Sequence, residues 1–265
     1  MMIIMKKLKY HDELWFNRIK LDKEDYMTIR LIEKEENSRH MIKEPLIEKL
    51  INYYMPLDII DYYLDENEDM GELERLINGA LPCSDNDKTR KGDFSEIISS
   101  EHLVQNYGYY FPYIKLQNKP NSEMSNQGDD ILGFKFNDVN EIIEICVGEV
   151  KFLANFNNNI FKKAHSQLKK SYNPRPKSLR MVVHYAINQK NKFSKEFIKL
   201  LSEKTFLETK ISNWIFCVTE KCHDDIDICN ETDFLDNLTL ISIYLPEISP
   251  FIHEVYDLSS GYYNE

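Results

Sequence analysis

With 265 residues, 42% of them hydrophobic and 29% charged, the chain is long enough for one large domain or two small ones around a sizeable core. Its 8 glycines argue against a glycine-rich nucleotide-binding architecture, and its formal net charge of −11 excludes a global basic field that would attract nucleic acid. The 5 cysteines are irregularly spaced, which excludes a disulfide framework and indicates a reducing cytoplasm. No apolar run is long enough to cross a membrane, and the N-terminal residues do not have the order of a signal peptide, so we expect a cytoplasmic protein that makes no membrane contact.

The N-terminal part of the chain is predicted to begin with strands and to continue with helices. Apolar residues in 14–19 and 26–32 indicate two or three short strands, and the charged run 33–40 indicates a loop. Helical spacing of apolar residues starts at Pro45, which suits the first turn of a helix, and Pro56 should end that helix and start the next. None of these segments carries recognisable chemistry.

A polar segment at 82–91 is the candidate boundary between two parts of the chain. Before it, an acidic start and a helical pattern predict a further helix over 66–78. We therefore expect an N-terminal region, 1–81, with a partner-binding or regulatory role. A second domain, 82–265, is expected to hold the chemistry.

The centre of the chain is predicted to form a helix followed by a hairpin of two strands. The apolar stripe of 92–107 is helical and is stopped by Gly108, and 109–116 indicates a short strand. Residues 130–136 and 141–151 then read as two antiparallel strands around a turn rich in Asn and Asp.

The register of this hairpin would bring three charged residues together. A four-residue turn over 137–140 pairs the strands so that Asp130 lies opposite Val147 and diagonal to Glu149, about 7–8 Å away. Glu149 and Lys151 are two residues apart, so both side chains project from the same face of their strand. The two carboxylates are then close enough to share a small cation.

Downstream of the hairpin, helices and strands are expected to alternate. The predicted order is a helix over 158–172, a strand over 180–187, a helix over 194–206, strands over 211–218 and 238–245, and a mostly irregular tail over 246–265. Alternation of this kind after a hairpin indicates an α/β fold with a mixed sheet flanked by helices, preceded by an α-rich N-terminal region.

The charged residues at the end of the hairpin form a donor set that suits Mg²⁺ or Mn²⁺. Asp130 and Glu149 supply two carboxylates and leave positions for water and a substrate phosphate. An ion held there polarises a phosphodiester and lowers the pKa of a bound water. Lys151 would orient that water or stabilise developing charge, and Glu96 on the preceding helix could be a direct or an outer ligand. The pattern therefore predicts a metal-dependent phosphodiester hydrolase.

An Asp at the head of one strand and Glu-x-Lys at the end of the next resembles the PD-(D/E)xK nuclease core. Gly-Asp-Phe-Ser-Glu at 92–96 and Gly-Asp-Asp-Ile-Leu-Gly at 128–133 make the chain similar to the HamA-type nuclease subunit of the two-component Hachiman anti-phage system. The resemblance covers about residues 80–155. It implies a restriction-endonuclease-like core that degrades DNA with little sequence preference. It also implies a helicase partner that monitors DNA, holds the nuclease and releases it on phage infection.

The resemblance also assigns roles to particular residues. It implies two metal ligands, a catalytic lysine and a glutamate on the helix, which are Asp130, Glu149, Lys151 and Glu96, respectively. Two positions depart from the family pattern. Asp129 stands where a proline is usual, and Val150 stands where a small residue is more usual.

A cluster of basic residues follows the Glu-x-Lys motif. From Phe152 to Lys195 there is no Asp or Glu, but there are ten Lys or Arg residues; because the whole chain carries −11, the remainder carries −21. Each phosphate that such residues neutralise adds affinity that does not depend on base sequence. The predicted DNA-binding residues are Lys162, Lys163, Lys169, Lys170, Arg175 and Lys177.

Other interpretations of the sequence stay open. The three charged residues of the hairpin could form an ion pair at a strand end, in a catalytically silent subunit that binds DNA or a partner. The chain could also be a stand-alone restriction endonuclease. A zinc site could be suggested by Cys217, Cys222, His223 and Cys229. Their gaps do not match a pair of zinc knuckles, so free thiols are expected.

Overall fold

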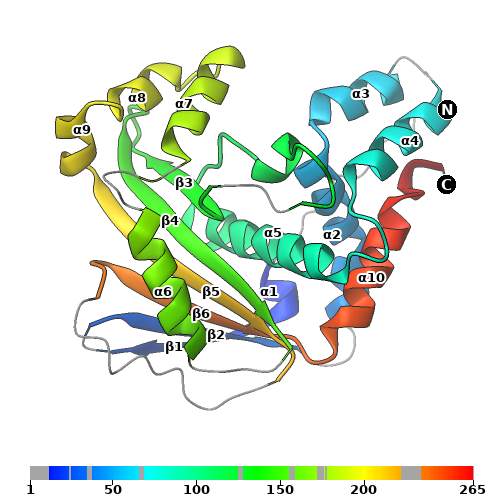
Figure 1. The fold of residues 1–265 in the computed structure, drawn as a ribbon, viewed down its shortest axis with the longest axis horizontal. Coiled ribbons are helices and arrows are strands. Elements are labelled where there is room, and N and C mark those ends of the chain that lie inside the picture. The colour runs from blue at the N-terminus through cyan, green and yellow to red at the C-terminus, as the bar shows by residue number, and fades with distance from the viewer. Residues whose placement is uncertain are drawn as a thin grey trace.

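A computed structural model of the protein places six strands in one sheet, flanked by helices, within the residues that it describes (Figure 1). The described residues are 12–23, 25–34, 38–65, 69–124, 128–154, 159–171, 176, 178–221 and 234–264. The strands are β1 (Phe16–Asp22), β2 (Met27–Glu33), β3 (Ile131–Phe136), β4 (Ile142–Leu153), β5 (Lys210–Thr219) and β6 (Leu238–Tyr244). The helices are α1 (Asp12–Trp15), α2 (Ser38–Tyr54), α3 (Leu57–Asp65), α4 (Met70–Ala80), α5 (Asp87–Tyr107), α6 (Asn159–Ser171), α7 (Leu179–Asn188), α8 (Ser194–Lys199), α9 (Glu203–Glu208), α10 (Ile248–Ser259) and the 3₁₀ turns η1 (Lys115–Asn118) and η2 (Tyr262–Asn264).

The sheet is mixed, with the strand order β1-β2-β6-β5-β4-β3. Antiparallel pairs form its two edges, β1 with β2 and β3 with β4, whereas β2, β6, β5 and β4 run parallel to one another. Parallel neighbours need a crossover connection, and α6 to α9 lie on the one between β4 and β5. The predicted α/β fold with a mixed sheet is confirmed, and so are the strands expected over 211–218 and 238–245.

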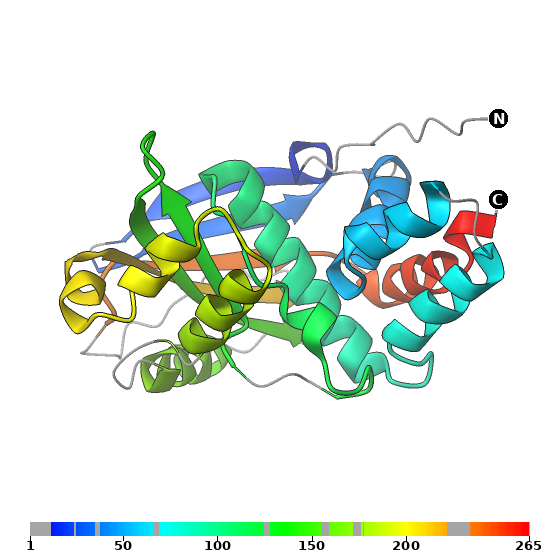
Figure 2. The same cartoon turned by 90° about the horizontal axis from the view of Figure 1, so that it is seen from above.

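Helices cover both faces of the sheet, and alternate residues of each strand point to one face or the other. On β4, Cys146 and Val150 belong to the apolar core shared with α2, α4, α5 and α10. Ile145 and Val147 belong to the second core, shared with α6 to α9. Figures 1 and 2 show α2, α3, α4 and α10 gathered at one end of the molecule, with α5 running from that group along the sheet. Residues from both layers can therefore meet beside β3, the edge strand.

Residues 180–187 form a helix, so the predicted strand is wrong there. The run contains β-branched and aromatic residues, which favour strands. The buried side chains of α7 nevertheless follow helical spacings of three and four, and they are Leu179, Val182, Val183 and Ala186. Because these four side chains pack together in the second core, the segment forms helix α7 and not a strand.

Two further predictions fail on either side of the hairpin. The tail 246–265 is not mostly irregular, because α10 packs against α2 and α5. Residues 109–116 are not a strand; they make one β bridge, between Tyr110 and Phe134, and then turn into η1. Both segments are ordered by what they pack against, which local patterns do not report.

The other helices are present with shifted ends. α2 starts at Ser38, inside the predicted loop 33–40, so Pro45 lies in the helix interior instead of the first turn. α3 follows Pro56 as predicted, α5 begins earlier than expected, and the single helix predicted over 194–206 is divided into α8 and α9. The helices expected over the regions of α4 and α6 are confirmed.

The N-terminal region shares its core with the rest of the chain. Ile77 of α4 and Phe94 and Ile97 of α5 lie in the same apolar cluster, although the polar segment 82–91 separates them in sequence. β1 and β2 extend the sheet that β3 to β6 form. A division of function near residue 82 stays a prediction.

Candidate active site

The β3–β4 hairpin brings Asp130 beside Glu149. Ile131 lies opposite Gly148, and continuing this pairing by one residue puts Asp130 opposite Glu149. The predicted register, in which Asp130 lies opposite Val147, is wrong by two residues. Opposite residues of an antiparallel pair project from the same face and lie closer than diagonal neighbours, so this register favours a closer approach of the two side chains than the predicted one.

Two features of the turn cause this difference. Phe136 pairs with Ile142 instead of Glu141, because the Asn137 side chain closes a longer turn and accepts a hydrogen bond from the Glu141 backbone N–H at 2.8 Å. A bulge between Lys135 and Phe136 then adds a second residue on the β4 side. A shift of two residues leaves every side chain on its predicted face.

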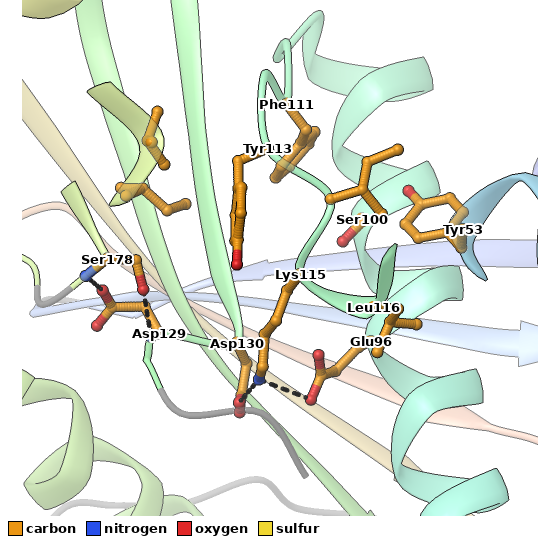
Figure 3. Close-up of a pocket in the computed structure, with 13 residues that line it drawn as sticks. Tyr53, Glu96, Ser100, Phe111, Tyr113, Lys115, Leu116, Asp129, Asp130 and Ser178 are labelled. Carbon is orange, nitrogen blue, oxygen red and sulfur yellow. Dashed lines mark hydrogen bonds and ion pairs between the residues drawn. The ribbon is translucent and has the colours of Figure 1, made fainter. Parts of the chain in front are cut away.

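Asp130 is held through both of its carboxylate oxygens. Its Oδ2 accepts a hydrogen bond from the backbone N–H of Val150 at 3.0 Å, and its Oδ1 accepts one from Lys115 Nζ at 3.0 Å. The same ammonium lies 3.1 Å from Glu96 Oε1 on α5, and Figure 3 shows it between the two carboxylates. The structure thus brings Glu96 and Asp130 together through Lys115, a residue that the sequence did not single out.

Glu149 and Lys151 project from the same face of β4, as their spacing predicts. Lys151 donates a hydrogen bond to Glu149 Oε1, and the two side chains, Lys151 and Glu149, are 21% and 16% exposed, respectively. Val150 points the other way into the core, with 7% exposure. A small residue is not needed at this position, because the valine side chain faces away while its N–H binds Asp130.

Burial and repulsion act on the carboxyl groups of the site. Burial raises the pKa of Glu96, with the Lys115 ammonium opposing this change and the Asp130 carboxylate adding to it. Burial, followed by the Asp130 carboxylate, raises the pKa of Glu149, and Lys151 opposes it. Burial lowers the pKa of Lys115, but its two acidic neighbours outweigh burial and leave the pKa above its usual value. Three acids facing two lysines therefore favour the binding of a proton or of a further cation.

A buried clasp fixes the segment just before Asp130. The Asp129 N–H donates to Ser178 Oγ at 2.8 Å, and the Ser178 N–H donates to Asp129 Oδ2 at 2.9 Å (Figure 3). Gly128 has φ of 120°, and a Cβ there would collide with Ser178 Oγ. Asp129 therefore ties the chain to the start of α7, which restrains the backbone at the position where a proline was expected. The glycine before the acid is the one sequence signal of this contact.

A pocket opens beside Lys115. Glu96, Lys115 and Asp130 form part of its wall, and Tyr53 and Tyr113 are among the other residues that line it (Figure 3). Lys115 escaped prediction because it lies at the end of a segment that was expected to be a strand. It reaches the pocket because the chain turns there into η1.

The predicted DNA-binding residues are partly described. Lys162, Lys163, Lys169 and Lys170 lie on α6, which packs on β4 and β5 (Figure 1). Two positions, Arg175 and Lys177, lie outside the described residues, as do the candidate zinc ligands Cys222, His223 and Cys229. Cys217 is a buried free thiol, as expected.

The fold and site define a mixed α/β protein with an acidic, lysine-containing site beside the edge strand of its sheet. The HamA family model matches residues 6–258 of the chain. The chain belongs to the HamA family, as the motifs at 92–96 and 128–133 predicted. It is 27% identical over 197 residues to the Hachiman protein HamA of Bacillus cereus, in an alignment that covers 74% of this chain and 69% of that protein. None of the described helices is long and apolar enough to cross a lipid bilayer.

Proposed function

We propose that the protein is a metal-dependent DNA nuclease of the PD-(D/E)xK type that acts in anti-phage defence under the control of a helicase partner. The observation that carries the proposal is the hairpin geometry. Asp130 lies opposite Glu149, and Lys151 follows two residues later on the same face. Membership of the HamA family and similarity to a Hachiman protein support the role in defence.

The donor set around Asp130 fits a divalent cation such as Mg²⁺ or Mn²⁺. Among the described residues, no group of three or more His, Cys, Asp or Glu side chains is arranged to hold a metal ion, so the ion would rest on Asp130 and Glu149. Mg²⁺ commonly takes one or two carboxylates from a protein and keeps its other positions for water and phosphate oxygens. Asp130 already holds the cationic end of Lys115 on Oδ1, which fits a site that stabilises positive charge. When bound, the ion would polarise the phosphodiester and lower the pKa of a water ligand.

The chain's own residues supply the rest of the chemistry. Lys151 is assigned to the attacking water and to the negative charge that develops on the phosphate, since an ammonium in a largely buried position stabilises such charge strongly. Val150 keeps Asp130 in place through its backbone N–H. This division leaves the side chain at position 150 free to pack in the core.

α6 is the candidate path for DNA. Its four lysines form two pairs spaced seven residues apart, so each pair lies on one stripe of the helix, about 10 Å from end to end. Lys163 and Lys170 are exposed, whereas Lys162 and Lys169 are half-buried. Phosphates bound along such a stripe add affinity without regard to sequence, which supports degradation with little sequence preference.

Single substitutions in the hairpin test the proposal. Asp130→Ala and Lys151→Ala should each lower Mg²⁺-dependent degradation of linear and plasmid DNA by about 100-fold or more, because each removes a group that acts on the charge of the transition state. The assay uses the purified full chain, alone and with its helicase partner, and circular dichroism checks the fold. The matched control is Lys204→Ala, since Lys204 is 83% exposed on α9 and should leave activity unchanged.

Three results would contradict the proposal. Full activity of Asp130→Ala or Lys151→Ala would refute the assignment of those residues. Discrete fragments from one defined site would favour a stand-alone restriction endonuclease. DNA binding without any cleavage by the wild type would favour a catalytically silent subunit.

A further inference from the structure

The ammonium of Lys115 fills the space between Glu96 and Asp130. Its Nζ lies 3.1 Å from Glu96 Oε1 and 3.0 Å from Asp130 Oδ1, which are within the usual range of N–H···O hydrogen bonds. The Lys115 side chain is 11% exposed and each acid is 17% exposed. Two largely buried carboxylates repel each other unless a cation lies between them, and here the protein itself supplies that cation.

The segment that carries Lys115 is anchored away from the site. Lys119 forms an ion pair with Asp93 of α5, and these side chains are only 3% and 6% exposed. Gln117 Nε2 donates a hydrogen bond to the carbonyl of Asn52 on α2 at 2.7 Å. Because Asp93 lies about one helical turn before the site glutamate, Lys119 and Lys115 contact successive turns of α5. The backbone that carries Lys115 is therefore held in place by contacts with α2 and α5.

We propose that Lys115 takes the place of a second metal ion, so that the site binds one divalent cation, between Asp130 and Glu149. The inference rests on the proposed nuclease function and deepens it. Glu96 is then a positioning residue that holds Lys115, and it is not a metal ligand. The sequence left open whether Glu96 is a direct or an outer ligand, and this inference excludes the direct role.

The geometry opposes a second ion between Glu96 and Asp130. The ammonium keeps their oxygens at 3.0 and 3.1 Å, whereas Mg²⁺ needs oxygen ligands at about 2.1 Å in a near-octahedral arrangement. A second ion would require the ammonium to leave and both carboxylates to close in. Lys115 is also tethered beside them, which gives its ammonium an effective concentration on the order of millimolar or more.

Counting bound Mn²⁺ ions on the full chain tests this inference without measuring cleavage. Bound Mn²⁺ is counted by calorimetric titration, and unbound Mn²⁺ is measured by electron paramagnetic resonance. The wild type should bind one ion per chain, and Asp130→Ala should bind none at this site. Lys115→Met should bind a second ion. Glu96→Gln should still bind one ion, with an affinity about 10–100-fold weaker than that of the wild type, as expected for loss of an outer partner. The control Lys204→Met should match the wild type.

The outcomes separate the two proposals. Two ions in the wild type, or loss of Mn²⁺ binding in Glu96→Gln, would overturn the inference and leave the nuclease assignment standing. If Lys115→Met fails to fold, the Glu96→Gln result decides alone. No Mn²⁺ binding by the wild type would overturn the metal-dependent nuclease itself, and the inference with it.

Discussion

Two contacts between a lysine and an acid lie one turn apart on α5, and their surroundings differ. Lys119 and Asp93 are 3% and 6% exposed, and Tyr54 donates a further hydrogen bond to the same carboxylate. Lys115 instead serves two acids at the wall of a pocket. A buried, saturated pair has no room for a ligand, whereas Asp130, which shares Lys115 with Glu96, also has Glu149 beside it, and these two acids can hold a divalent cation. Residue type and spacing do not separate a structural pair from a functional site; the number of acids per cation and the access to solvent do.

The largest expected loss of stability comes from breaking the buried ion pair. Asp93→Ala leaves the Lys119 ammonium buried without its counter-charge, which should lower the free energy of unfolding by about 3–5 kcal/mol. Glu96→Ala leaves Lys115 with its other acceptor, Asp130, so its loss should be much smaller. Urea unfolding followed by circular dichroism measures both variants. Equal losses would remove the distinction between the two sites.

Loss of the clasp between Asp129 and Ser178 should cause the second-largest loss of stability. Ser178→Ala leaves the buried Asp129 N–H without its acceptor and should cost about 1–3 kcal/mol of unfolding free energy. Nuclease activity should fall at temperatures where the fold is intact, because the clasp sets the backbone next to Asp130. The matched control is Ser202→Ala, since the Ser202 side chain makes no capping hydrogen bond at the start of α9. Wild-type stability of Ser178→Ala would show that the clasp is not needed.

Charge reversal on α6 should have the smallest effect on the fold and a specific effect on DNA binding. Replacing Lys163 and Lys170 by Glu should change the unfolding free energy by no more than about 0.5 kcal/mol, because both are exposed. The slope of log affinity for DNA against log salt concentration should become less negative by roughly 0.9 for each phosphate that the protein no longer neutralises. Every protein in this comparison also carries Asp130→Ala. Fluorescence anisotropy of a labelled duplex gives the salt slope of the charge-reversed variant, and Lys204→Glu is the control. An unchanged slope would place the DNA path elsewhere.

The hairpin shows how far sequence reasoning reaches. Side chains alternate along a strand, so Asp130, Glu149 and Lys151 share a face whether the register is the predicted one or the observed one. The turn at Asn137 and the bulge at Lys135 could not be predicted from the sequence, because each depends on how the two strands pair. Both errors shifted the pairing by one residue, and their sum left the site on its predicted face.

The sequence by itself determined the features that arise between near neighbours: the α/β class, the ends marked by Pro56 and Gly108, and the common face of the three hairpin charges. Only the tertiary structure decided that 180–187 is a helix and that Lys115 lies between Glu96 and Asp130. The physical reason is range. Alternation and helical spacing are written into adjacent residues, whereas the conformation of a short apolar run and the partner of a charge depend on the surface that packing brings to it.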